Sequence, residues 1–213
     1  MADSTAAKHI TAIIDCLNQS AEYAVLRNYV GLPDANHSRD IDIIISAESF
    51  RTVRKTLVDA IVATGWKILT YLHSDRLTTF VCGVQQGNNT EVVQWDFFMH
   101  TSVFGIVLMD ADEFLTRRKF NGFLYHVDDE GEFLDKYLYN RAVGSQYPAK
   151  YKSLRQQVTD SDAVRSKLSQ IYGVSSLAEC DKTPSNKLLL RALWYNITKH
   201  PFGIAGRINF FLY

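Results

Sequence analysis

The spacing of apolar residues divides the first part of the chain into helical and extended segments. Apolar residues at helical spacing predict an amphipathic helix over 6–19 and a second helix that begins after Ser46, a typical N-cap residue, and ends at Gly65. Between these helices, a short apolar run at 23–26 and an alternating run at 39–45 predict two strands joined by a loop of turn-forming residues. The chain therefore opens as helix, strand, loop, strand, helix.

The remaining pattern indicates a sheet followed by helices. Further β-type runs lie at 66–72, 77–84, 91–99 and 104–109, and helical patterns dominate afterwards at 128–139, 160–173 and 184–197. A hairpin turn is expected at 86–89. We therefore predict an α+β fold, with a sheet domain over 1–105 and a mainly helical region over 106–213.

Composition narrows the class of protein. The 213 residues contain 23 Lys and Arg and 23 Asp and Glu, so the formal net charge is zero and gives no general attraction to nucleic acid or anionic lipid. We accordingly expect no nucleic-acid partner. No apolar run approaches the roughly 20 residues that span a bilayer, and the N-terminus lacks the layout of a secretory signal, so we expect no transmembrane segment and a cytoplasmic location. Three widely separated cysteines argue against a disulfide framework or a zinc site.

Two carboxylates in the run 39–45 are the most informative feature of the sequence. Asp40 and Asp42 stand at positions i and i+2 of the predicted strand, so both side chains point to the face opposite the isoleucines. Like charges at this range repel each other, and their desolvation is costly unless a cation lies between them. Mg²⁺ prefers such hard oxygen ligands. The pair therefore predicts a metal site, although a solvated strand end is also consistent with the pattern.

A third carboxylate, Asp96, lies within the apolar run 91–99. If that strand lies beside the strand 39–45, Asp96 reaches Asp40 and Asp42. Three acids around a pair of metal ions form the clamp needed for phosphoryl or nucleotidyl transfer. An alternative role for Asp96 is that of a structural hydrogen-bond partner.

This order of elements and acids resembles the nucleotidyltransferase superfamily that includes DNA polymerase β, especially its small bacterial members that modify antibiotics or sugars. The resemblance covers about residues 6–100 and rests on Arg39-Asp40-Ile41-Asp42-Ile43 and on Trp95-Asp96-Phe97. The segment 26–33 is similar to a branch associated with surface-polysaccharide and sugar-nucleotide enzymes. The resemblance implies a mixed sheet flanked by helices, and transfer of a nucleoside monophosphate from an NTP to a hydroxyl or phosphate, with Mg²⁺ (or Mn²⁺) held by the three acids.

The sequence departs from this superfamily directly after its first strand. A Gly-Ser or Gly-Gly turn normally holds the triphosphate there, whereas this chain has Leu26-Arg27-Asn28-Tyr29. Arg27 is expected to replace the turn as a charge-assisted phosphate ligand, with Asn28 donating from its amide. Ser38 and Arg39 are further candidate phosphate contacts. The alternatives are a loop that no longer binds a nucleoside triphosphate in the usual way, with Arg27 as a plain surface residue, and a solvated loop at Ser38 and Arg39.

Three functions remain open at this point. The first is Mg²⁺-dependent nucleotidyl transfer to a small molecule or glycan intermediate, in which Asp96 also acts as general base and the region 106–213 binds the acceptor. The second is transfer of a phospho-alditol or phospho-sugar from a CDP-linked donor in polysaccharide biosynthesis. The third is a nucleotide-binding domain without turnover.

Overall fold

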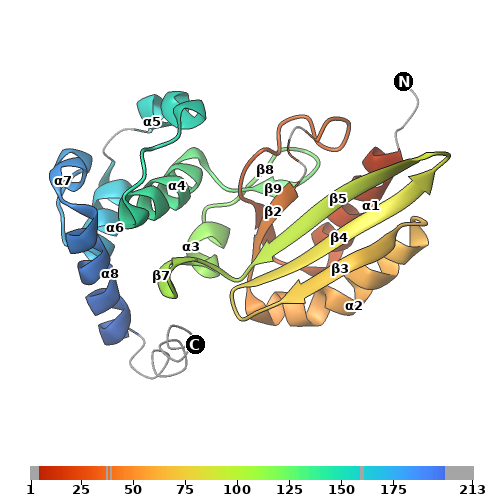
Figure 1. The fold of residues 1–213 in the computed structure, drawn as a ribbon, viewed down its shortest axis with the longest axis horizontal. Helices are drawn as coiled ribbons and strands as arrows, with labels where there is room; N and C mark the ends of the chain where they lie inside the picture. Colours follow the sequence, from red (N-terminus) through yellow and green to blue (C-terminus); the bar gives the residue numbers. More distant parts are fainter. Residues whose placement is uncertain (1–4, 37, 39, 159–160, 200–213) are drawn as a thin grey trace. The chain divides into compact units, whose positions relative to one another are not determined.

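The computed structural model describes residues 5–36, 38, 40–158 and 161–199 (Figure 1). The chain forms two compact units. One contains residues 1–100 and 110–128, and the other contains 101–109 and 129–213. The polypeptide therefore passes from the first unit to the second, returns, and passes over again.

The first unit is built on a seven-stranded sheet. Its spatial order is β3 (Lys67–His73), β4 (Leu77–Gln86), β5 (Asn89–Phe98), β2 (Asp40–Ile45), β1 (Tyr23–Val25), β9 (Tyr125–His126) and β8 (Lys119–Phe120). The pairs β2–β5 and β1–β9 are parallel, and the other pairs for which a register is defined are antiparallel. The sheet is therefore mixed, and its centre joins strands that are about fifty residues apart in sequence.

Two long helices cover one face of this sheet, as Figure 1 shows for α1 (Thr5–Ser20) and α2 (Ala47–Ala63). Ser46 caps α2, because its hydroxyl oxygen accepts a hydrogen bond from the Ser49 N–H at 3.0 Å. Gly65 follows the helix with a φ of 80°, a conformation that glycine adopts without strain. The core between helices and sheet contains the inward-facing side chains of both layers, among them Ile10, Ile14, Ile41, Ile43, Phe50, Leu57, Trp95 and Phe97.

The second unit is mainly helical. Its helices are α4 (Asp129–Val143), η1 (Ala149–Tyr151), α5 (Lys152–Gln157), α6 (Asp162–Tyr172), α7 (Leu177–Lys182) and α8 (Ser185–Lys199). Ser161 caps α6, and Gly173 ends it in the left-handed conformation. None of the helices in the described ranges combines the length and the apolar character that crossing a membrane requires.

The α+β class is confirmed: a mixed sheet is flanked by helices and followed by a helical C-terminal part. The predicted strand 104–109 starts too early, because Phe104 and Gly105 have positive φ angles and form the turn between β6 (His100–Val103) and β7 (Ile106–Asp110). The predicted boundary at residue 105 falls in this same turn, within the segment 101–109 of the second unit. The short helix α3 (Ala111–Leu115) and the two-residue strands β8 and β9 were not predicted, since elements of that length carry no periodic pattern.

Candidate metal centre

The three predicted carboxylates lie on two adjacent strands. In the parallel pair β2–β5, Asp42 is in register with Asp96, and Asp40 is in register with Gln94. The expectation that the Asp96 strand lies beside the Asp-x-Asp strand is thus confirmed. Period-two alternation turns Ile41 and Ile43 into the core and leaves the acids on the opposite face of the sheet.

The carboxylates of Asp40, Asp42 and Asp96 are close enough to share a cation. One oxygen from each residue lies within 4.8 Å of the others. Asp42 is only 2% exposed and Asp96 7%, while Asp40 is partly exposed. Two unit charges 4.8 Å apart repel by about 3 kcal/mol at an effective dielectric constant of about 20. Such a group of acids on one sheet face costs stability unless positive charge offsets it, and it offers the hard oxygen donors that Mg²⁺ and Mn²⁺ prefer.

Neighbouring side chains fix the orientation of Asp96. The Thr79 hydroxyl on β4 donates to Asp96 Oδ1 at 2.6 Å, and the Gln94 amide donates to Asp96 Oδ2 at 2.8 Å. Thr79 is in register with Asp96 across the antiparallel pair β4–β5, which explains why its side chain reaches the carboxylate. Because an ionised carboxylate oxygen accepts more than one bond, both oxygens keep capacity for a further partner.

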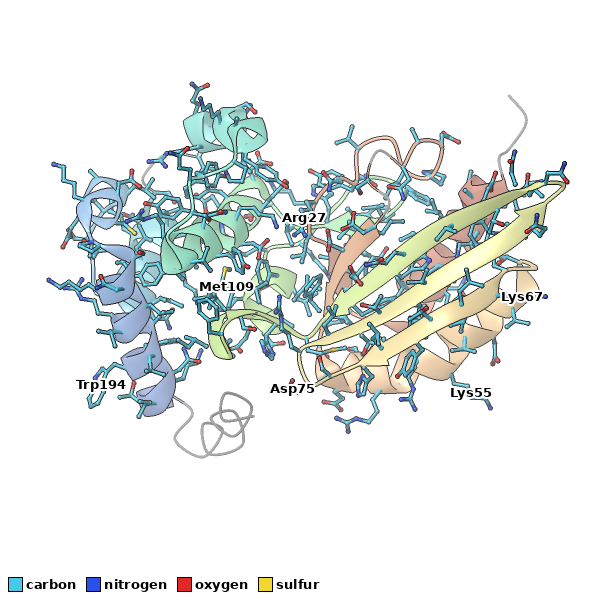
Figure 2. The ribbon with its side chains drawn as sticks, viewed as in Figure 1. Arg27, Lys55, Lys67, Asp75, Met109 and Trp194 are labelled. Carbon is cyan, nitrogen blue, oxygen red and sulfur yellow. The ribbon has the colours of Figure 1, made fainter. Side chains whose placement is uncertain are left out.

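Arg27 lies against the most buried of the three acids. Its Nη2 atom is 2.8 Å from Asp42 Oδ2, and its side chain is 17% exposed. Arg27 comes two residues after β1, and the Leu26 N–H donates to the Asp42 carbonyl oxygen at 2.8 Å, which ties the two chain segments together. Figure 2 labels Arg27 beside β2. The structure therefore joins Arg27, a predicted phosphate ligand, to a predicted metal ligand.

The other predicted phosphate contacts differ in position. Asn28 directly follows Arg27 and has a φ of 57°, so the backbone turns sharply at this residue. The Ser38 hydroxyl donates to the Asp40 carbonyl oxygen at 2.6 Å, which uses its only donor on the backbone of β2. Arg39 lies outside the described residues. Asn28 is thus next in sequence to the arginine that pairs with Asp42, and Ser38 contacts the strand that carries Asp40 and Asp42.

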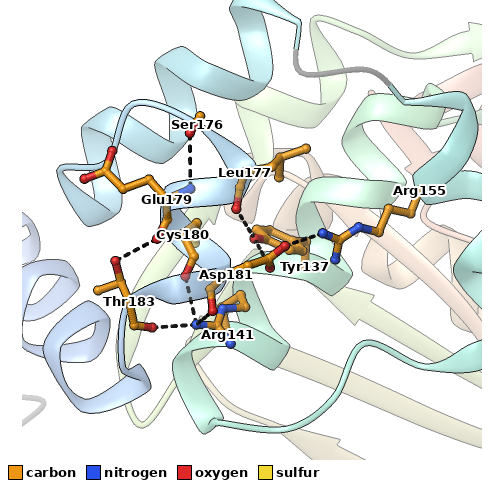
Figure 3. A network of polar contacts seen from close by, with 9 residues as sticks. All are labelled: Tyr137, Arg141, Arg155, Ser176, Leu177, Glu179, Cys180, Asp181 and Thr183. Carbon is orange, nitrogen blue, oxygen red and sulfur yellow. Dashed lines mark hydrogen bonds and ion pairs between the residues drawn. The ribbon is translucent and has the colours of Figure 1, made fainter.

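A second polar cluster, shown in Figure 3, belongs to the helical unit. The Tyr137 hydroxyl donates to Asp181 at 2.7 Å, and Arg155 pairs with the same carboxylate. Arg141 Nη2 donates to the carbonyl oxygens of Cys180 at 2.8 Å and Thr183 at 2.6 Å, at the C-terminal end of α7. Its charge therefore stabilises a helix end, and these contacts fasten α7 and α5 to α4.

No protein-family model matches the chain, and no curated protein matches it. Among solved structures, the crystal structure of JHP933 from Helicobacter pylori is similar over 93% of this chain and 94% of that one. The TM-score is 0.42 and the sequence identity 10%. A likeness this weak carries no argument about function, which has to rest on the site itself.

Proposed function

We propose that the chain is a Mg²⁺-dependent nucleotidyltransferase that transfers a nucleoside monophosphate from a nucleotide donor to a hydroxyl or phosphate of a small molecule or glycan intermediate. The observation that carries this proposal is the group formed by Asp40, Asp42 and Asp96, whose oxygens lie within 4.8 Å of one another on one face of the sheet. A group with this spacing is suited to hold divalent cations rather than to stabilise the fold.

The local charge supports a divalent cation. When ionised, the three acids and the Arg27 guanidinium together carry a formal charge of −2, which one divalent ion would neutralise. All three ligands are carboxylates, the donor type that suits Mg²⁺ and Mn²⁺, and no thiolate or imidazole from the described part of the chain joins the group. These ligands therefore fit Mg²⁺, the metal implied by the resemblance of the sequence to the nucleotidyltransferase superfamily.

Each side chain has a distinct role in the proposed reaction. Asp40 and Asp42 would hold the metal, and Arg27 would contact the phosphates of the donor. Asp96 would complete the site and accept the proton of the acceptor hydroxyl, with Thr79 and Gln94 holding its carboxylate in place. When bound, Mg²⁺ supplies the charge that activates the attacking oxygen and stabilises the leaving pyrophosphate.

The decisive experiment measures metal binding before activity. Free Mn²⁺ is followed by electron paramagnetic resonance during titration of the wild-type protein and of Asp42→Asn and Asp96→Asn. We expect wild type to bind Mn²⁺ and either variant to lose at least about tenfold in affinity, since each removes one charged ligand. Asp59→Asn, an exposed acid on α2, is the matched control and should bind as wild type does.

The donor is then identified by thermal shift with Mg²⁺ and each of the four NTPs, in parallel with CDP-linked donors. Stabilisation by an NTP, with release of pyrophosphate when an acceptor is supplied, supports nucleotidyl transfer. Stabilisation by CDP-linked donors alone favours transfer of a phospho-alditol or phospho-sugar instead. If wild type binds no Mn²⁺, the proposal is wrong, and binding of Mn²⁺ without binding of any nucleotide overturns it as well.

A further inference from the structure

The candidate metal centre already contains a positive charge that comes from the protein. Arg27 Nη2 lies 2.8 Å from Asp42 Oδ2, and this carboxylate is the least exposed of the three acids. A buried carboxylate without a nearby cation is strongly unfavourable, so the guanidinium offsets part of the cost of burying Asp42. The same carboxylate also belongs to the group that would hold a divalent cation.

We propose that Arg27 is an internal counter-ion that competes with the divalent cation for Asp42, so that metal binding displaces the guanidinium from this carboxylate. The inference rests on the proposed function, because it needs a metal at the acidic group. It adds a property that the function does not require: the free protein keeps Asp42 paired, and metal affinity is set below the value that the carboxylates alone would give.

Electrostatics gives the direction of this effect. A divalent ion shared by three carboxylates whose oxygens lie within 4.8 Å would stand close to a guanidinium held at 2.8 Å from one of them. The two cations repel each other at that range, so the states with Arg27 on Asp42 and with metal on Asp42 disfavour each other. In thermodynamic terms the coupling between them is negative, and by linkage it acts equally in both directions.

The position of Arg27 in the chain offers its guanidinium a second binding partner, the phosphates of the donor. Arg27 lies at the start of the loop after β1, and the next residue, Asn28, has a φ of 57° that turns the backbone away from the strand direction. Guanidinium groups bind phosphate oxygens in two-point geometry, which a phosphate-bearing donor would offer. Release from Asp42 would therefore make Arg27 available to the donor when the metal has arrived.

The test compares Mn²⁺ affinity in wild type, Arg27→Gln and Arg27→Lys, again by electron paramagnetic resonance and without nucleotide. Arg27→Gln should bind Mn²⁺ about tenfold more tightly than wild type, within the range of roughly 5- to 150-fold usual for such coupling. Arg27→Lys keeps the charge on a shorter side chain without the planar fork, and a gain of about threefold is expected. Arg54 is an exposed arginine on α2. Arg54→Gln removes one positive charge outside the site and should leave the Mn²⁺ affinity unchanged.

The outcomes separate this inference from the proposed function. If wild type binds Mn²⁺ and Arg27→Gln binds it equally or more weakly, Arg27 does not compete with the metal and the inference is overturned. If wild type does not bind Mn²⁺ at all, the proposed function fails first. Circular dichroism checks that Arg27→Gln is folded; if it is not, Arg27→Lys decides, and an unchanged affinity in that variant overturns the inference.

Discussion

Strand β5 carries a buried polar cluster on each of its two faces, and the clusters differ in charge. On the face covered by the helices, the Trp95 indole N–H donates to His9 Nε2 at 3.1 Å. His9 Nδ1 lies 3.0 Å from the Thr64 hydroxyl, which donates to the Ile61 carbonyl oxygen at 2.7 Å. Because the indole only donates, Nε2 must accept, and the ring proton is then on Nδ1 and donated to Thr64. The opposite face carries the acidic group around Asp96.

The contrast separates a structural polar cluster from the cluster proposed to bind a cation. The His9 cluster is neutral, each ring nitrogen has a partner within the protein, and the imidazole stacks on Trp66 with ring centroids 4.3 Å apart. In the acidic group three carboxylates lie together, and the Arg27 guanidinium pairs with one of them. Burial of the first costs little once its hydrogen bonds form, whereas the second keeps excess negative charge that a cation would offset.

The largest effect on stability is expected on the helix-covered face. His9→Ala removes a fully buried ring, its stacking on Trp66 and the partner of the Trp95 N–H, which should lower the free energy of unfolding by about 3 to 4 kcal/mol. Urea unfolding followed by circular dichroism measures this loss. The Mn²⁺ affinity of the folded variant should remain that of wild type, because His9 lies on the other side of the sheet. A change in Mn²⁺ affinity as large as the loss of stability would show that the two faces are not independent.

Two local rules predicted which acidic residues form the group. Period-two alternation places Asp40 and Asp42 on one face, and an acid within an apolar strand singles out Asp96. That the two strands are neighbours was only a condition of the prediction, and neither their parallel direction nor the register of Asp42 with Asp96 was predicted, since nothing local in the sequence fixes the register between distant strands.

The partners of these residues were harder to predict. Alternation alone places Gln94 beside Asp96, but Thr79 reaches the carboxylate only through the register of β4 with β5. The pairing of Arg27 with Asp42 was missed, because the sequence indicated a phosphate contact and gave no sign of an ion pair across fifteen residues. His9 is 86 residues from Trp95, and a single histidine on an amphipathic helix carries no signal for such a contact.

The pH dependence of the free energy of unfolding tests the neutral character of the His9 cluster. Burial lowers the pKa of His9 from 6.5 to about 4. Between these values the unfolded chain binds a proton that the folded protein does not, so the free energy of unfolding should fall as the pH drops from 6.5 to 4, by about 3 kcal/mol from this residue. His9→Gln retains an acceptor for Trp95 and a donor for Thr64 but does not titrate. Urea unfolding of both proteins at several pH values isolates the contribution, and parallel pH profiles would contradict it.

The smallest expected effect is on Mn²⁺ affinity, and it distinguishes two adjacent threonines on β4 that face opposite sides of the sheet. Thr79 donates to Asp96, whereas Thr78 contacts His73 Nδ1 at 2.7 Å. Thr79→Val leaves Asp96 Oδ1 without this donor, and the less fixed carboxylate should bind Mn²⁺ about tenfold more weakly, as is usual when a residue that orients a metal ligand is lost. Thr78→Val deletes the same hydroxyl one residue away and should leave the Mn²⁺ affinity unchanged. Thr79→Ser keeps the hydroxyl and should bind Mn²⁺ as wild type does. Equal Mn²⁺ affinities in Thr79→Val and Thr78→Val would mean that Thr79 is only a structural partner of Asp96.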